Sequence, residues 1–471
     1  MKPTRTVDVA IIGAGTAGQS AFEQINKITD NIVVINKGYW TTTCATVGCM
    51  PSKLVIAGAE RAFHALQSEE FGIGTSQKSN IEGTQVMARI QNGRDHFTKS
   101  VKKAIEDWDE NKKIEGKASI IKERFIQVNE EIIEYKYLII ATGTQAVIPE
   151  QFSDKLGSML LTSDTIFEMK DLPNKMAIVG AGPVGIELAQ AFNRLGVEVI
   201  LLNRTSKIAG ITDKTINQKA IDCIGTELTM HLNSKITNVD RENGQAVLYF
   251  TDDKNQERTW QGDKVLIATG RHHVLDELGI ENLAVELDDD KKPIHVNKQT
   301  GQIADSTIFI AGDTSTHTPI LHLASYVGKN AGKVIASLLQ DKDQPTFEPL
   351  TPLSIVFSEP QIAQVGAHID NIRYELGKDN FVIGKFNFEK QGRSRIEGVN
   401  CGLIHIYANK KSGEILGASM VAPDAEYISH ILAMAITHKL TVTELLKTPF
   451  YHPTILEGLR VALLDILNQL K

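Results

Sequence analysis

The feature of this sequence that most constrains its fold is a glycine pattern that occurs twice, each time between an apolar strand-like run and a helix-like run. The first copy is VDVAIIGAGTAGQSAF, from residue 7, and the second is KMAIVGAGPVGIELAQAF, from residue 175. In G-x-G-x-x-G, the first glycine makes a tight turn, the second lets the backbone approach a pyrophosphate, and the third lets helix and strand pack closely. Two such copies predict two dinucleotide-binding domains in an α/β chain, with turn glycines Gly13, Gly15, Gly18, Gly180, Gly182 and Gly185.

Three later strand ends are also typical of dinucleotide-binding domains. Each glycine pattern is followed downstream by an apolar strand with the same ending, YLIIATG up to Gly143 and KVLIATG up to Gly270. A third run, IFIAGD, places Asp313 where a parallel strand stops, the edge at which ligands bind in open α/β sheets. The alternative for Asp313 is a carboxylate that caps the following helix.

The sequence changes character after Pro345. The runs LSIVFSEP, FVIGKFNF, GLIHIYAN and EILGASMVA predict successive strands, and two helical stretches close the chain. We therefore expect a separate α+β domain in this part. The polar segment 82–111 predicts a solvated helix without a chemical role.

Composition and charge argue against several classes of protein. With 471 residues, of which 42% are hydrophobic, the chain is long enough for several domains. The net charge of -7 and the scattered basic residues argue against nucleic acid as a partner. The apolar run at residues 7–12 is too short for a secretory signal or a membrane span, so we predict a cytoplasmic protein with no membrane partner.

Two of the four cysteines, Cys44 and Cys49, lie five positions apart in the segment TCATVGCMPSK. In a reducing compartment such a pair is more often catalytic or metal-binding than structural. We predict no metal site, because no second pair of cysteines or histidines stands at ligand spacing. Cys223 and Cys401 have no comparable setting, so we expect them to be small apolar side chains without a chemical role.

The spacing of the cysteine pair sets a condition on the backbone. In a regular helix, residues five apart have Cα atoms roughly 9 Å apart, whereas a disulfide needs less than about 7 Å. Cys44 and Cys49 therefore bridge only if the turn between them is compacted, which Gly48 permits and the helix-disrupting Pro51 favours. Lys53 follows, and a cation near a thiol favours the reactive thiolate. The alternative is a pair of small buried hydrophobic residues.

A resemblance to a known protein family spans the chain. It rests on the cysteine segment, both glycine patterns, both ATG strand ends, AGD and, near the C-terminus, HPTILEG. The sequence resembles the pyridine nucleotide-disulfide oxidoreductases of the dihydrolipoamide dehydrogenase and glutathione reductase type. The resemblance implies an α/β fold with two Rossmann-like dinucleotide-binding domains, for FAD and NAD(P), and a C-terminal α+β dimerisation domain. The implied limits are FAD-binding residues 1–148 with the cysteine pair, NAD(P)-binding residues 149–271, a central FAD-binding part 272–345 and an interface domain 346–471.

The same resemblance assigns roles to individual residues. Cys49 would lie against the flavin as the charge-transfer thiolate, and Cys44 would exchange with the substrate disulfide. The residues implied at FAD are Gly13, Gly15, Gly18, Asn36, Thr42, Thr43, Lys53, Gly143 and Asp313, of which Asp313 would bond the ribityl chain. The residues implied at the nicotinamide nucleotide are Gly180, Gly182, Gly185, Glu187, Asn203, Arg204 and Gly270.

Two residue pairs match family positions that serve catalysis. Lys53 and Glu187 correspond to a pair beside the flavin N5, where the glutamate keeps the lysine charged and helps to position nicotinamide. The alternative for Glu187 is a solvated residue in the first turn of a helix. In FYHPTILEG, His452 would take and return the proton of thiol–disulfide exchange, oriented by Glu457. In family members this histidine reaches the cysteines of the other subunit, which implies a homodimer; the alternative is a structural histidine.

A few positions depart from the family pattern. Asn36 stands where an acidic residue usually grips the adenosine ribose of FAD. Asn203 and Arg204 stand where an NAD-using dihydrolipoamide dehydrogenase usually has glutamate, so a 2′-phosphate is not repelled. Gly185 favours NAD, because glutathione reductases usually carry alanine there. NAD and NADP both remain open.

Dihydrolipoamide is the expected substrate by elimination. The ending LLDILNQLK has no cysteine pair, unlike mercuric reductases and large thioredoxin reductases, and the two cysteines argue against single-cysteine coenzyme A disulfide reductases and soluble transhydrogenases. The arginines that bind glutathione in glutathione reductases are not recognisable. We predict a homodimeric FAD enzyme that passes two electrons between a lipoyl group, free or on a lipoyl domain, and NAD(P). The alternatives are an NADPH-dependent small-thiol disulfide reductase and a catalytically idle flavoprotein subunit of a multienzyme complex.

Overall fold

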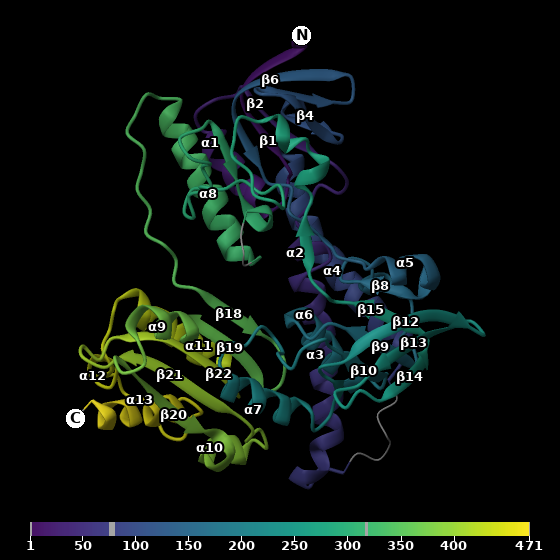
Figure 1. Ribbon diagram of the computed structural model, residues 1–471, viewed down its shortest axis with the longest axis vertical. Helices are drawn as coiled ribbons and strands as arrows, with labels where there is room; N and C mark the ends of the chain where they lie inside the picture. Colours follow the sequence, from purple (N-terminus) through teal and green to yellow (C-terminus); the bar gives the residue numbers. More distant parts are fainter. Residues whose placement is uncertain (1, 75–80, 316–318, 471) are drawn as a thin grey trace. The chain divides into compact units, whose positions relative to one another are not determined.

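The computed structural model describes residues 2–74, 81–315 and 319–470 of a mixed α/β chain (Figure 1). The chain divides into two compact units, each built from three separate stretches. The first unit comprises Met1–Pro51, Ile90–Val147 and Arg271–Pro349, and the second comprises Ser52–Arg89, Ile148–Gly270 and Leu350–Lys471. The predicted α/β class is confirmed, because each unit contains a sheet with parallel strands. In each of these sheets, one strand leads directly into a glycine pattern.

The first unit is built on a seven-stranded sheet. Its parallel part consists of β3 (Lys113–Glu115), β2 (Ile32–Asn36), β1 (Arg5–Ile12), β6 (Glu131–Ile140) and β17 (Ile308–Ile310). Its antiparallel edge consists of β5 (Phe125–Val128) and β4 (Ala118–Lys122), and a small ribbon pairs β7 (Thr144–Ala146) with β16 (Arg271–His273). The buried apolar run of β1 is typical of a parallel strand that is covered on both faces.

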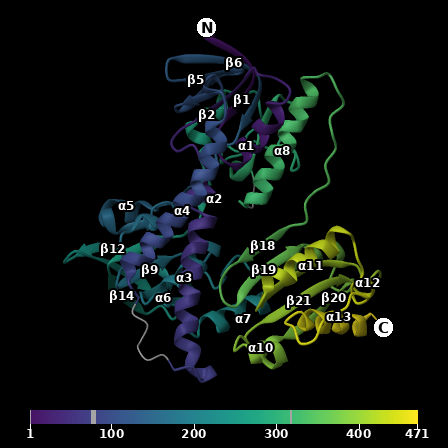
Figure 2. The same ribbon diagram turned by 180° about the vertical axis from the view of Figure 1, so that it is seen from behind.

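Two helices of the first unit, α1 (Thr16–Ile25) and α8 (Leu321–Leu338), lie side by side in both views (Figures 1 and 2). Small residues allow the close approach of their backbones. A Cβ on Gly328 would lie 2.3 Å from the carbonyl oxygen of Ala17, and one on Gly332 would lie 2.7 Å from that of Ala21. The helix pair therefore covers the sheet with little space between its members.

The second unit contains the other glycine pattern. Its parallel sheet has the order β11 (Thr229–His231), β10 (Glu198–Leu202), β9 (Lys175–Val179), β15 (Lys264–Ile267) and β8 (Leu160–Thr162). An antiparallel sheet of β12 (Lys235–Glu242), β13 (Gln245–Thr251) and β14 (Glu257–Gly262) follows. The associated helices are α5 (Glu150–Leu156), α6 (Pro183–Arg194) and α7 (Lys214–Ile224).

The C-terminal part of the second unit is an antiparallel sheet with helices beside it. The strand order is β18 (Leu353–Val356), β19 (Gln361–Gly366), β22 (Ile415–Ala422), β21 (Leu403–Asn409) and β20 (Phe381–Asn387). The helices are α9 (Ile369–Leu376), α10 (Gly392–Ile396), α11 (Ala425–Thr437), α12 (Val442–Leu445) and α13 (Glu457–Gln469). Strand β19 is additional to the predicted strands, because glutamines interrupt its apolar pattern.

Between β2 and β3 the chain forms α2 (Thr43–Thr46), α3 (Cys49–Gln67) and α4 (Gly83–Glu106). Helix α4 confirms the helix expected in segment 82–111, and its exposed faces agree with a solvated helix. Among the described residues, no helix combines the length and apolar character needed to cross a membrane.

A buried polar cluster fixes α7 against the C-terminal sheet. Asp213 caps the helix by accepting hydrogen bonds from the backbone amides of Thr215, at 2.9 Å, and Ile216, at 3.2 Å. Its second carboxylate oxygen accepts from the Tyr407 hydroxyl, at 2.9 Å, and lies 2.7 Å from His405 Nδ1, both on β21. Burial raises the pKa of Asp213, but these hydrogen bonds and the charge of His405 outweigh it and lower the pKa to about 2.

This low pKa predicts an acid-dependent contribution to stability. Asp213 has an ordinary pKa of 3.8 when unfolded and about 2 when folded, so its contribution to the free energy of unfolding is present above pH 3.8 and is lost as pH falls through about 2. Asp213→Asn should be less stable than the wild type by about 2 kcal/mol at neutral pH, and the gap should narrow in acid. Thermal unfolding midpoints across this pH range test the prediction, with the exposed Asp222→Asn as the control. A gap that does not change with pH would contradict it.

Candidate functional site

The first glycine pattern forms a turn that only glycine allows at two of its positions. Gly13 follows β1 with a φ of 109°, and a Cβ there would lie 2.2 Å from the carbonyl oxygen of Ala141. A Cβ on Gly18 would lie 1.9 Å from the carbonyl oxygen of Gly13. The start of α1 is therefore packed directly onto the end of the strand.

Gly15 has a different environment from the other two glycines. Apart from its chain neighbours, no atom of the described residues lies within 4 Å of a Cβ built on Gly15, and its φ of -74° suits any residue. Gly15 is the N-cap of α1, which has no side-chain cap and no acidic residue in its first turn. Open space in front of an uncapped, positively polarised helix end fits the pyrophosphate of a dinucleotide.

The second glycine pattern repeats this geometry in the second unit. Gly180 has a φ of 111°, and a Cβ on it would lie 2.3 Å from the carbonyl oxygen of Ala268. A Cβ on Gly185 would lie 1.9 Å from the carbonyl oxygen of Gly180. A Cβ on Gly182 would meet no atom of the described part of the chain within 4 Å, its chain neighbours apart. Gly182 is the N-cap of α6 and has no side-chain cap bond. The residues present therefore fit a second dinucleotide.

Asn36 and Asn203 occupy equivalent places at the ends of β2 and β10. The side-chain oxygen of Asn36 accepts a hydrogen bond from the amide of Ala14, at 3.0 Å, and that of Asn203 accepts from Ala181, at 3.2 Å. The Asn203 Nδ2 also donates to the carbonyl oxygen of Lys207, at 3.1 Å. Both asparagines thus support the glycine turns, which the sequence reasoning did not foresee. Arg204 beside Asn203 is exposed.

Asp313 lies in a short turn after β17, next to the ATG end of β6. The Thr314 hydroxyl donates to the carbonyl oxygen of Gly143, at 3.0 Å, which ties the two strand ends together. Burial raises the pKa of Asp313, and the charge of Arg271 opposes this rise. Helix α8 starts at Leu321 with Ile320 as its N-cap, so the alternative that Asp313 caps the following helix is wrong. In the second unit Gly270 has a φ of 124° and open space around it.

The two cysteines of the predicted redox pair lie at the junction of two helices. Cys44 is half-buried in α2, and Cys49 is exposed at the start of α3. A Cβ on Gly48 would lie 3.3 Å from the Cα of Cys44, so the turn is compact at the predicted glycine. The helix is interrupted between Thr46 and Cys49, and Pro51 lies in the first turn of α3, so the expected break between the two cysteines is present.

The threonines before this pair have unequal environments. Thr42 is buried and caps α2, because its hydroxyl accepts a hydrogen bond from the amide of Ala45 at 3.2 Å. Thr43 is exposed. Thr42 therefore helps to set the start of the cysteine segment.

Lys53 and Glu187 form an ion pair within the second unit. The lysine Nζ donates to both carboxylate oxygens, at 2.9 and 2.8 Å. The Phe357 amide donates to Glu187 at 2.9 Å, and its ring centroid lies 4.4 Å from the lysine Nζ. Glu187 is only 6% exposed, so the alternative of a solvated helix residue is wrong. The carboxylate is thus held by three hydrogen bonds, two of them from the lysine.

A network behind this ion pair was not predicted from the sequence. Gln190 and Glu359 exchange two hydrogen bonds, at 2.7 and 2.8 Å, between α6 and the segment after β18. Buried Arg194 on α6 forms ion pairs with Glu227 and Glu359. The sequence indicated this network only weakly. It places Glu187, Gln190 and Arg194 on consecutive turns of one helix, but it does not reveal which residues they bind.

His452 and Glu457 form a hydrogen-bonded pair at the start of α13. His452 Nδ1 lies 3.1 and 3.2 Å from the two carboxylate oxygens of Glu457, which also accepts from the amide of Thr454 at 3.1 Å. The hydrogen bond with His452, followed by that of Thr454, lowers the pKa of Glu457. The His452 side chain is 80% exposed. The imidazole is oriented through Nδ1, which leaves Nε2 for proton transfer.

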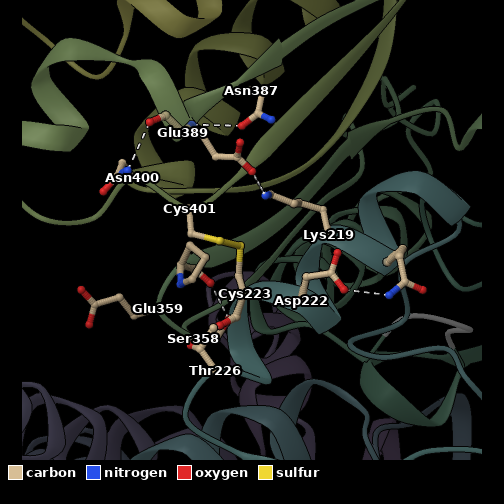
Figure 3. The surroundings of a disulfide bond; sticks show 12 residues. Lys219, Asp222, Cys223, Thr226, Ser358, Glu359, Asn387, Glu389, Asn400 and Cys401 are labelled. Carbon is tan, nitrogen blue, oxygen red and sulfur yellow. Dashed lines mark hydrogen bonds and ion pairs between the residues drawn. A yellow bond between two sulfur atoms is a disulfide. The ribbon is translucent and has the colours of Figure 1, made fainter.

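The expectation that Cys223 and Cys401 are small apolar side chains without a chemical role is wrong. They form a disulfide, with Cα atoms 5.9 Å apart, between α7 and the segment before β21 (Figure 3). The two residues are 178 positions apart, and the packing of α7 on β21 and β22 brings them together. The described ranges, 2–74, 81–315 and 319–470, contain no group of three or more histidine, cysteine or acidic side chains placed to hold a metal ion.

Comparison with known proteins agrees with this arrangement. Residues 7–328 match the pyridine nucleotide-disulphide oxidoreductase family, and residues 353–463 match its dimerisation domain. A mercuric reductase of Staphylococcus aureus is 27% identical over 463 residues, which cover 97% of this chain and 82% of that protein. A dihydrolipoyl dehydrogenase of Geobacillus stearothermophilus is 27% identical over 475 residues, which cover 97% and 96%.

A solved structure shows that the fold is shared more widely. The Cu(II) complex of the HOCl-induced flavoprotein disulfide reductase RclA from Escherichia coli has a TM-score of 0.81 and 20% identity, and the match covers 99% of this chain and 100% of that one. LpdA from Mycobacterium tuberculosis has a TM-score of 0.80 and 19% identity, with 97% and 99% covered.

The open space at Gly15 predicts a variant that folds but loses its dinucleotide. In Gly15→Ala the new methyl group meets no side chain or backbone of the described residues beyond its chain neighbours and lies where the pyrophosphate would approach, so FAD should bind about tenfold or more weakly. The ratio of flavin to protein absorbance measures the occupancy, and circular dichroism checks the fold. Gly58→Ala is the matched control, because its methyl group also has open space. Full flavin occupancy in Gly15→Ala would contradict the assignment.

Proposed function

Because the chain belongs to the pyridine nucleotide-disulphide oxidoreductase family, we propose that it oxidises a lipoyl dithiol and passes the two electrons to NAD or NADP. The family is FAD-dependent and uses a pyridine nucleotide. FAD supplies a two-electron carrier between the thiols and the nucleotide. The proposed substrate is free dihydrolipoamide or the lipoyl group of a multienzyme complex.

The observation that carries the proposal is the cysteine junction followed one helical turn later by a fixed ion pair. Cys49 starts α3, and Lys53 on the same helix is bound to Glu187. Two thiols on a compact turn suit exchange with a substrate disulfide, and a lysine held charged suits the neighbourhood of a reduced flavin. The dihydrolipoyl dehydrogenases among the relatives support the same substrate class.

We assign the thiol chemistry to four side chains. The Cys44–Cys49 disulfide accepts the two electrons of the dithiol, so that the substrate leaves as a disulfide and the two cysteines become thiols. His452 takes the proton from the attacking substrate thiol and returns it later, and Glu457 stabilises the protonated imidazole. We propose that His452 serves the cysteines of the second subunit, which makes the homodimer the working form; the dimerisation domain match supports this.

The nucleotide site is proposed at the second glycine pattern. No carboxylate stands at the end of β10, where Asn203 and exposed Arg204 are found instead. The proposed domains are those of the sequence analysis, with FAD bound by residues 1–148 and 272–345, NAD(P) by 149–271 and the interface formed by 346–471. A cytoplasmic location is part of the proposal.

A steady-state assay tests the function directly. The purified FAD-loaded protein is supplied with dihydrolipoamide and NAD or NADP, and in the reverse direction with lipoamide, glutathione disulfide or Hg(II) and NADH or NADPH. Hg(II) is included because the similarity to a mercuric reductase equals that to a dihydrolipoyl dehydrogenase. The proposal expects kcat/KM to be highest with lipoamide. A higher kcat/KM with glutathione disulfide or Hg(II) would identify that acceptor as the substrate in place of lipoamide. No turnover with any acceptor would favour an idle flavoprotein.

The role of His452 predicts a loss confined to one half-reaction. His452→Gln should slow dithiol exchange by roughly 10²–10⁴-fold, the usual weight of a general acid–base group. Flavin reduction by NADH or NADPH in anaerobic stopped-flow measurements should stay within about twofold, because that step uses no thiol proton. His430→Gln, another exposed histidine, is the control. Equal losses in both half-reactions would indicate a structural role.

Arg204 predicts the nucleotide preference. If its guanidinium binds a 2′-phosphate, a contact worth roughly 1.5–3 kcal/mol, Arg204→Ala should lower kcat/KM for NADPH by about ten- to a hundredfold and leave NADH unchanged. Arg241→Ala removes an exposed arginine of the same unit and serves as the control. The NADP assignment would be contradicted if the wild type strongly prefers NADH and Arg204→Ala leaves the ratio of the two kcat/KM values unchanged.

A further inference from the structure

The disulfide between Cys223 and Cys401 has no part in the chemistry proposed above. Cys223 lies in the last turn of α7 and is 4% exposed, whereas Cys401 is half-buried in the segment before β21. Figure 3 shows the bond with Lys219 and Glu389 in its surroundings. A small thiol or disulfide in solution can therefore reach the bond from the side of Cys401.

The helix that carries Cys223 is also held by contacts that do not depend on the disulfide. Asp213 at its N-terminus binds His405 and Tyr407 on β21. Lys219 in its middle forms an ion pair with Glu389. These contacts keep α7 on the C-terminal sheet when the disulfide is reduced. The bond can then open and close without loss of the fold, and its state changes only how firmly the C-terminal end of α7 is held.

Helix α7 is connected directly to the loop that follows β10. The Asn217 side chain accepts a hydrogen bond from the amide of Ile208, at 2.9 Å, and donates to the carbonyl oxygen of Ser206, also at 2.9 Å. Asn203 donates to the carbonyl oxygens of Thr205 and Lys207 within the same loop. Helix α7 therefore supports the end of this loop, at Ser206 and Ile208.

We propose that Cys223 and Cys401 are a second redox site, whose disulfide form tightens nucleotide binding by fixing α7 and loop 203–208. This inference rests on the proposed function in one respect, namely that the loop holds the adenosine end of NAD(P). A loop held in its binding arrangement loses less conformational entropy when the nucleotide binds. Reduction of the disulfide leaves the loop contacts in place but loosens the helix that supports them.

The oxidant assigned to this site is a low-molecular-weight disulfide. Cys401 as thiolate attacks the disulfide and releases one thiol, and Cys223 then attacks the mixed disulfide and releases the second. In sum, two protein thiols and one small disulfide give the protein disulfide and two small thiols. In the reducing compartment proposed above, a disulfide of this kind is usually transient or redox-sensing rather than permanent.

The first experiment compares the wild type with Cys401→Ser and Cys223→Ser, each loaded with FAD. Calorimetry measures the Kd for NAD⁺ and NADP⁺, which cannot donate electrons. Both variants should bind the preferred nucleotide about five- to tenfold more weakly than the wild type, the size of an ordinary coupling between two sites. Asp222→Asn, a neighbouring exposed position on α7 that leaves the disulfide intact, should bind like the wild type. Equal affinity in all four proteins would overturn the proposal.

The second experiment uses the unmutated protein and so does not depend on the variants folding. The wild type is equilibrated at graded ratios of reduced to oxidised glutathione, its thiols are trapped by alkylation, and peptide mass spectrometry reports the 223–401 pair separately from the 44–49 pair. The Kd should follow the oxidised fraction of the 223–401 pair. A 223–401 bond that stays oxidised in the folded protein over the whole range would show a permanent structural bond and overturn the proposal.

These tests distinguish a failure of the proposed substrate from a failure of the proposed redox site. Absence of lipoamide turnover together with a redox-dependent Kd would contradict the proposed substrate alone. Full lipoamide turnover together with an invariant Kd would contradict the redox site alone.

Discussion

Close packing of a helix onto a glycine turn is the constraint on which both nucleotide-binding halves depend. In each half, a Cβ on the third glycine would lie 1.9 Å from the carbonyl oxygen of the first, so no other residue allows this approach without a shift. The uncapped helix N-terminus then faces open space at the second glycine. Asn36 and Asn203 support these turns through equivalent hydrogen bonds. The geometry that suits a pyrophosphate thus follows from backbone packing together with these two side-chain hydrogen bonds.

The ion pair of Lys53 and Glu187 shows how a charged group is kept in place away from water. Glu187 is almost fully buried and uses its oxygens for the lysine and for the amide of Phe357. Burial of the carboxylate is costly and the Lys53 side chain is still 35% exposed, so the ion pair adds little net stability by itself. Its fixed geometry is consistent with a functional role, and the surrounding network of Gln190, Arg194 and Glu359 restricts the helix that carries it.

Helix α7 links three features of the second unit that the sequence presents far apart. Its N-terminal cap is shared with the C-terminal sheet through Asp213, its middle supports the loop after β10 through Asn217, and its end carries Cys223. A change at any of these points is transmitted along one rigid helix. The proposed coupling between the disulfide and the loop rests on this helix, because the bond at Cys401 does not touch the loop.

The sequence by itself determined the features that arise from neighbouring residues. The glycine spacing, the apolar strands and the compact turn at Gly48 are local, because sterics and hydrogen bonds within a few residues define them. The pairing of His452 with Glu457 was implied by the family resemblance. Tertiary structure alone decided the partners of Cys223, Asp213 and Arg194, and the short strand β19. These depend on which faces of distant segments pack together, and a residue type carries no information about a partner 178 positions away.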